Sequence, residues 1–61
     1  MTTVLYAHRG FIWNDVYASE AAALDSFGLY FEATVLDVFP GTVTGREMRR
    51  LAKTHGCKVG R

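Results

Sequence analysis

The sequence predicts one α+β domain, spanning residues 1–61, with a small two-layer ββαβα fold. Three observations support this prediction. Two β-branched and aromatic stretches flank a short turn, an alanine-rich stretch follows a serine, and a threonine-capped stretch lies near the C-terminus. If the first helix returns the chain across the sheet, the third strand lies antiparallel beside the first. We therefore expect a three-stranded antiparallel-type sheet of strand order 2-1-3 and two short helices.

The first two strands are predicted to form a hairpin from residues 2–8 and 11–17. Arg9 and Gly10 supply the turn, because glycine readily adopts positive φ. Phe11, Trp13, Asp15 and Tyr17 alternate with Ile12, Asn14 and Val16 along the second strand. Neither face of that strand is cleanly polar, so the pattern does not decide which face is buried.

A first helix is predicted over residues 20–27, with Ser19 as its N-cap and Glu20 in the first turn. Leu24 and Phe27 lie three residues apart and predict an apolar stripe that covers one face of the sheet. Gly28 is expected to end this helix.

The third strand is predicted over residues 29–39, which read LYFEATVLDVF. Its alternation predicts a wholly apolar face that meets the first helix. That face consists of Leu29, Phe31, Ala33 and Val35. Pro40 and Gly41 are expected to end the strand, because proline cannot donate a hydrogen bond to a neighbouring strand.

A second helix is predicted over residues 44–56, where Thr44 and Glu47 have the spacing of a capping box. The apolar stripe of this helix is expected from Met48, Leu51, Ala52 and His55. Gly56 is placed to end the helix. For residues 57–61 two alternatives stay open, a short edge strand or a loose tail.

The charges of the sequence are divided along its length. Residues 42–61 contain six of the seven basic residues and one acid, Glu47, which gives this segment a formal charge of +5. Residues 1–41 contain five acids and Arg9, a formal charge of −4. The basic residues are Arg46, Arg49, Arg50, Lys53, Lys58 and Arg61.

Three interpretations of the basic helix are open. Its cations can neutralise nucleic-acid phosphates, dock on an acidic protein surface, or form a solvated face balanced by the acids of residues 1–41. Trp13 and Tyr30 are candidates for stacking on a partner. The predicted partner-binding residues are therefore Arg46, Arg49, Arg50, Lys53, Lys58, Trp13 and Tyr30.

No catalytic, cofactor or metal signature is present, so we expect a protein that is not an enzyme and binds no cofactor. His55 and Cys57 offer two ligands, whereas a structural zinc site needs four. The single cysteine excludes an intrachain disulfide and favours a reducing, cytoplasmic setting. The sequence has neither a signal-peptide pattern nor a long uncharged stretch, and we expect no membrane association.

Two resemblances bear on function. The C-terminal run TGREMRRLAKTHGCKVGR resembles the first helix and strand of HicA-type toxins, which are small ribonucleases. The catalytic Gly-Ser-His segment of those toxins has no counterpart here, so their activity is not carried over. The segment from Val16-Tyr17-Ala18 through an Ala/Glu-rich helix to a strand ending in proline is similar in architecture to the phage inhibitor of bacterial RNA polymerase. That resemblance implies a phage-encoded inhibitor of a host enzyme.

The functional hypothesis is a non-enzymatic protein that binds another macromolecule, as a phage or mobile-element inhibitor of a host protein or nucleoprotein complex. The alternative is a nucleic-acid-binding module that uses the basic helix. The chain has more aromatic residues than a thin fold covers easily, and we expect those left exposed to mark an interface. A homodimer formed through that face, or through the open edges of strands two and three, is a further alternative.

Overall fold

The computed structural model describes residues 1–60 and confirms a small α+β fold, whose sheet has four strands rather than three. The strand order is β3-β1-β2-β4, so the expected 2-1-3 neighbours are present and a fourth strand lies beyond β2. The elements are β1 (Thr2–His8), β2 (Phe11–Tyr17), α1 (Glu20–Asp25), the 3₁₀ helix η1 (Phe27–Tyr30), β3 (Thr34–Pro40), α2 (Gly45–Thr54) and β4 (Lys58–Val59).

The predicted hairpin is confirmed residue for residue. β1 and β2 pair antiparallel from Thr2 opposite Tyr17 to His8 opposite Phe11, which leaves Arg9 and Gly10 as a two-residue loop. Both loop residues have positive φ, 52° and 82°. Such a turn matches the right-handed twist of the flanking strands, and glycine adopts it without steric cost.

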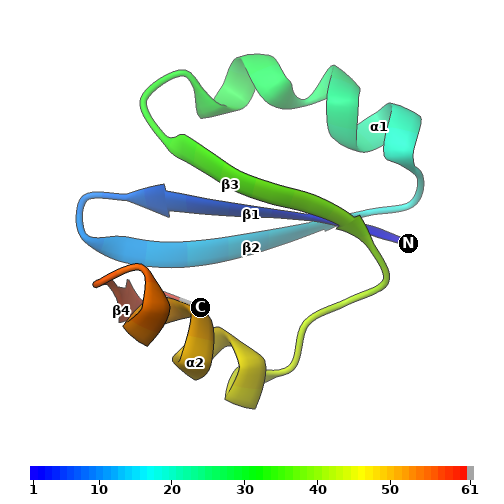
Figure 1. Cartoon of the computed structure of the whole chain (residues 1–61). Coiled ribbons are helices and arrows are strands. Elements are labelled where there is room, and N and C mark those ends of the chain that lie inside the picture. Colours follow the sequence, from blue (N-terminus) through cyan, green and yellow to red (C-terminus); the bar gives the residue numbers. More distant parts are fainter. Residues whose placement is uncertain (61) are drawn as a thin grey trace.

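The two helices cover opposite faces of the sheet, so the two-layer prediction is wrong (Figure 1). Val4 and Leu5 are adjacent in β1 and therefore point to opposite faces. Val4 belongs to the core beneath α1, together with Ala23 and Tyr30. Leu5 belongs to the core beneath α2, which also contains Ile12, Met48 and Ala52. A central strand that is apolar on both faces accounts for this arrangement.

α1 begins as predicted but packs differently. Ser19 is its N-cap, and the Ser19 Oγ accepts a hydrogen bond from the Ala22 amide at 3.2 Å. The helix ends at Asp25, and only Ala23 on it is buried. The predicted stripe is wrong, because Leu24 is 51% exposed and Phe27 is 38% exposed. A small alanine at the contact allows the helix to approach the sheet closely.

The first five residues of the predicted third strand are not extended, because β3 begins only at Thr34. Residues 27–30 instead form η1, so the predicted helix stop at Gly28 is wrong as well. The strand ends at Pro40 as expected. Its pairing with β1 shifts register opposite Leu5 and Tyr6, and this irregularity lets Leu36 face α2 while Val35 faces α1.

α2 is confirmed over most of its predicted length. The Thr44 hydroxyl accepts from the Glu47 amide at 3.1 Å, and the Glu47 carboxylate accepts from the Thr44 amide at 3.2 Å. Met48 and Ala52 are buried, whereas the predicted stripe residue His55 is the exposed C-cap. Gly56 follows with a φ of 67°, as a helix stop requires.

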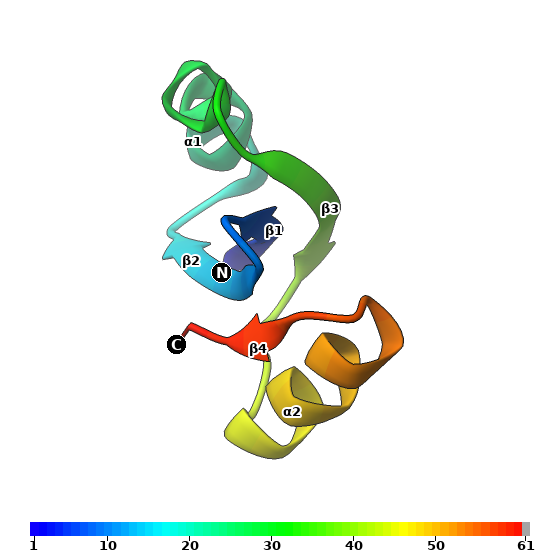
Figure 2. The same cartoon turned by 90° about the vertical axis from the view of Figure 1, so that its left-hand side faces the viewer.

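The open choice for residues 57–61 is decided for the described part of that segment. β4 pairs parallel with the start of β2, with Lys58 opposite Phe11 and Val59 opposite Ile12 (Figure 2). The amide of Gly60 donates to the Ile12 carbonyl at 2.8 Å. The edge of β2, which was expected to be open, is therefore covered at its first two residues. Arg61 lies outside the described residues.

Candidate functional site

The 3₁₀ helix η1 positions two large apolar side chains in solvent. Tyr30 is 7% exposed and points to the sheet, while its near neighbours Leu29 and Phe31 are 79% and 83% exposed. A 3₁₀ helix has three residues per turn, so the residues on either side of a buried one are directed away from the core. The predicted apolar face that contained Leu29 and Phe31 is therefore wrong for these two residues.

Tyr30 is held in place by a chain of hydrogen bonds that crosses from η1 to β2. The Tyr30 hydroxyl donates to the Asp15 Oδ2 at 2.6 Å, and the Tyr17 and Tyr30 hydroxyl oxygens lie 2.7 Å apart. Because a phenol has one hydrogen and that of Tyr30 goes to Asp15, Tyr17 is the donor of the second bond. Burial, followed by the bonds to Asp15 and Tyr17, raises the pKa of the Tyr30 phenol well above its usual value.

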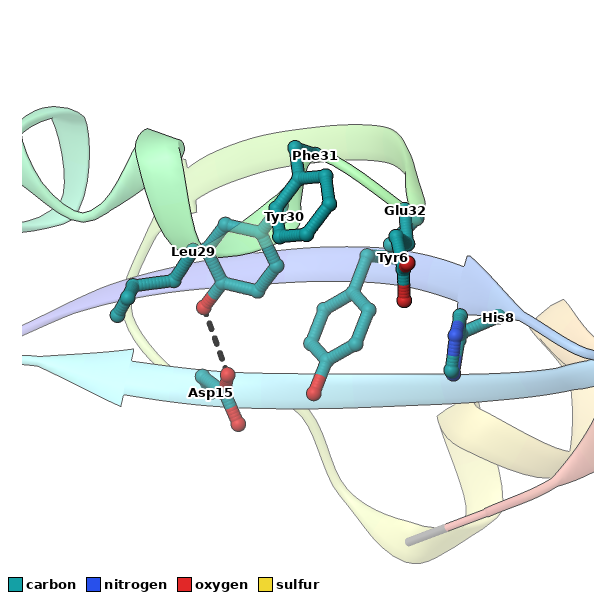
Figure 3. A pocket seen from close by; sticks show the side chains of 8 residues that line it. Tyr6, His8, Asp15, Leu29, Tyr30, Phe31 and Glu32 are labelled. Carbon is teal, nitrogen blue, oxygen red and sulfur yellow. Dashed lines mark hydrogen bonds between the residues drawn. The ribbon is translucent and has the colours of Figure 1, made fainter.

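A pocket of 290 Å³ lies between η1 and the sheet. We call it the tyrosine pocket. Figure 3 shows Asp15 and Tyr30 at one end, Glu32 and His8 at the other, and Tyr6 between them. The Tyr6 and Tyr30 rings are in contact, with centroids 4.7 Å apart. The residues that line the tyrosine pocket are Tyr6, His8, Asp15, Leu29, Tyr30, Phe31, Glu32 and Ala33.

The four predicted basic residues of α2 lie on the other side of the sheet, whereas Lys58 in β4 pairs with Phe11 and so shares the face of Trp13. Arg46, Arg49, Arg50 and Lys53 are all exposed along α2, and Lys58 is exposed in β4. Among the described residues, none of these five forms an ion pair with an acid of residues 1–41, although Arg50 interacts electrostatically with Glu47 of its own helix. The acids of the first part of the chain therefore do not neutralise this surface by direct contact.

Trp13 and Tyr30, the other two predicted binding residues, belong to the face of the tyrosine pocket. Trp13 pairs with Tyr6 in register and so shares its face, whereas the adjacent Ile12 packs beneath α2. Trp13 is half-buried, and its ring touches Gly60. The seven predicted binding residues are thus divided between two opposite faces of the sheet. Tyr30 is buried between η1 and the sheet, so it belongs to the core and not to the exposed surface.

The residues that sequence reasoning missed are Leu29 and Phe31 as surface groups, and Asp15 and Glu32 as acids of one pocket. One signal for the first pair was present in the sequence. Phe27 and Tyr30 are three residues apart, which is the spacing of a helical turn, and this competed with the alternating pattern of a strand. No local pattern relates Asp15 to Tyr30, because their contact depends on how η1 crosses the sheet.

Cys57 packs partly against the core beneath α2, and His55 is exposed at the end of that helix. Within residues 1–60, no three histidine, cysteine or carboxylate side chains converge as metal ligands would. In the same part of the chain, no helix has the length and apolar character needed to cross a membrane.

Comparison of the chain with protein-family models, curated proteins and solved structures finds no match.

Proposed function

We propose that this chain is a non-enzymatic binding protein that contacts a partner protein through Leu29, Phe31 and the rim of the tyrosine pocket. The exposure of two large apolar side chains beside one pocket carries the proposal, since exposed apolar groups that gather at one place mark interaction surfaces. Aromatic residues are also enriched at the centres of protein interfaces. The Tyr17–Tyr30–Asp15 hydrogen bonds fix the segment that presents them.

Inhibition by occlusion is the form of binding that we favour. A domain of 61 residues can cover a functional surface of a larger protein, and the phage-encoded inhibitors that the sequence resembles imply such a role. The partner would be a host protein or nucleoprotein complex, met in the host cytoplasm.

Affinity capture from a bacterial lysate, with and without nuclease, tests the proposal. The variant Leu29→Ser/Phe31→Ser is expected to lose a stoichiometric protein partner that the unmodified chain retains after nuclease treatment. Val16→Ser is the matched control, because Val16 is a 44% exposed apolar residue on β2 away from the pocket. Equal capture by both variants would show that the apolar rim is not the binding surface.

Size-exclusion chromatography with light scattering addresses the homodimer. A dimer that dissociates in Leu29→Ser/Phe31→Ser but not in Val16→Ser would assign this surface to a second copy of the chain instead.

Nucleic-acid binding through α2 is the second candidate, and it is supported by the exposure of the basic side chains of that helix, which form no ion pair with the acids of residues 1–41 in the described part of the chain. Four exposed cations on one helix would give affinity that falls steeply with salt concentration. In a mobility-shift assay at low salt, Arg49→Glu/Arg50→Glu should abolish a shift that Leu29→Ser/Phe31→Ser leaves intact. The absence of any shift with the unmodified chain would exclude this candidate.

A further inference from the structure

The tyrosine pocket combines carboxylates with aromatic rings, and its described lining contains one histidine, His8, but no lysine or arginine. Of the eight described residues that line it, Asp15 and Glu32 are acidic, three are aromatic, and none is lysine or arginine. The exposed cations of α2 lie beyond the opposite face of the sheet, where they do not contact these two carboxylates. The charge of the lining is therefore complementary to a positively charged group.

The rings are placed to contact such a group. Tyr6 lies between the two acids, and its ring and that of Tyr30 are tilted by 57° to each other. Cations are attracted to the faces of aromatic rings, most strongly when they are also desolvated. Leu29 and Phe31, at the rim, offer apolar surface to the methylene stem of a long side chain.

The size of the pocket limits what enters it. Its volume of 290 Å³ is just below the range of about 300–1,000 Å³ that is usual for small-molecule sites. One extended side chain fits this space better than a large cofactor does.

We propose that the tyrosine pocket receives a lysine or arginine side chain of the partner protein, with Glu32 as its principal ion-pair partner. This inference rests on the proposed function, because it names the group that the partner inserts beneath the Leu29–Phe31 rim. Glu32 is the exposed acid of the pocket, whereas Asp15 already accepts the hydrogen bond of Tyr30. A cation at Glu32 contacts Tyr6 without displacing that bond.

The test is an NMR titration of the ¹⁵N-labelled protein with blocked tripeptides. Peptides with central arginine or lysine should produce saturable shifts at the backbone amides of Tyr6, Phe31 and Glu32. Citrulline and norleucine peptides are the matched uncharged controls, and they should bind roughly five-fold more weakly or not at all, as expected for loss of a cation contact.

Two variants sharpen this experiment. Glu32→Gln should weaken arginine-peptide binding by roughly two- to five-fold, the loss expected for removal of one exposed charge partner. Asp25→Asn removes an acid of α1 that does not line the pocket, and it should bind as the unmodified protein does. Equal binding of charged and uncharged peptides, shifts located on α2, or no saturable shift at tens of millimolar peptide would each overturn the proposal.

The titration is independent of partner capture, so the two proposals fail separately. If Glu32→Gln captures the partner as well as the unmodified chain does, while Leu29→Ser/Phe31→Ser captures none, the binding surface stands and the inserted cation is refuted. If no partner is captured but the peptides bind as described, the pocket stands and the proposed function is refuted.

Discussion

Replacing Tyr30 by phenylalanine tests how the candidate surface is held in place. The change removes one hydroxyl and keeps a ring that is 7% exposed. Asp15 loses a charge-assisted hydrogen bond of 2.6 Å, and Tyr17 loses its acceptor at 2.7 Å. Water can reach the half-buried Asp15 and Tyr17, so we take the lower end of the usual values, about 2 kcal/mol in total.

That loss is large for this chain. Stabilities of about 0.05–0.15 kcal/mol per residue imply roughly 3–9 kcal/mol for a domain of this size. A loss of about 2 kcal/mol corresponds to a fall in Tm of roughly 8–16 °C. Urea denaturation followed by the fluorescence of Trp13, the single tryptophan, measures the free energy of unfolding.

Tyr17→Phe is the matched control for Tyr30→Phe. It removes the hydrogen bond between the Tyr17 and Tyr30 hydroxyls and leaves the Tyr30–Asp15 bond intact. The free energy of unfolding should therefore fall by about 1 kcal/mol or less. If Tyr30→Phe is as stable as Tyr17→Phe, the bond to Asp15 contributes nothing and the reasoning is refuted.

The pKa of Tyr30 gives the same prediction a pH dependence. Because burial and its hydrogen bonds raise this pKa, the folded state favours the neutral phenol. Its contribution is fully present below the pKa of an unfolded tyrosine, about 10, and is lost as pH rises above that value. The unmodified protein should therefore lose stability more steeply above pH 10 than Tyr30→Phe does. If the free energies of unfolding of the two proteins fall in parallel above pH 10, the pH dependence does not come from the Tyr30 phenol.

Two further predictions concern the C-terminal part of the chain. A Cβ on Gly60 would lie 2.6 Å from Trp13 ring atoms, so Gly60→Ala should cost about 1–3 kcal/mol in urea denaturation. Gly28→Ala is the control, since nothing lies within 4 Å of its Cβ position, and equal stability of both variants would refute the contact. The Thr44 backbone amide and then its hydroxyl hold the pKa of Glu47 below its usual range. The capping contribution is therefore present at neutral pH and lost as pH falls through the folded-state pKa of Glu47, and Glu47→Gln should flatten this acid limb in circular dichroism.

The elements specified by local patterns were predictable from the sequence. The hairpin follows from β-branched residues and a turn that needs positive φ, and α2 follows from the capping box and Gly56. Each of these signals depends on residues that lie only a few positions apart in the sequence. Tertiary packing was needed only to orient them.

The errors arose where packing overrides the local pattern. The alternating pattern of residues 29–35 is typical of a strand. The structure instead forms a helical turn at residues 27–30, which places the Tyr30 hydroxyl within hydrogen-bond distance of Asp15. The stripe of α1 failed because Ala23, rather than Leu24 or Phe27, makes the contact with the sheet. The first of these errors hid the candidate site, because it placed the exposed Leu29 and Phe31 in the core.

The positions of the two candidate surfaces determine how their variants should combine. α2 and the tyrosine pocket face away from each other across the sheet, so a single small contact cannot include both. One partner that wraps around the domain would use both surfaces. The losses of binding free energy caused by Leu29→Ser/Phe31→Ser and by Arg49→Glu/Arg50→Glu should then add, because distant sites without shared contacts are independent. If only one surface binds the partner, the combined variant should be no weaker than the more damaging single one. The combination therefore distinguishes a wrapped nucleoprotein target from a protein contact on one face.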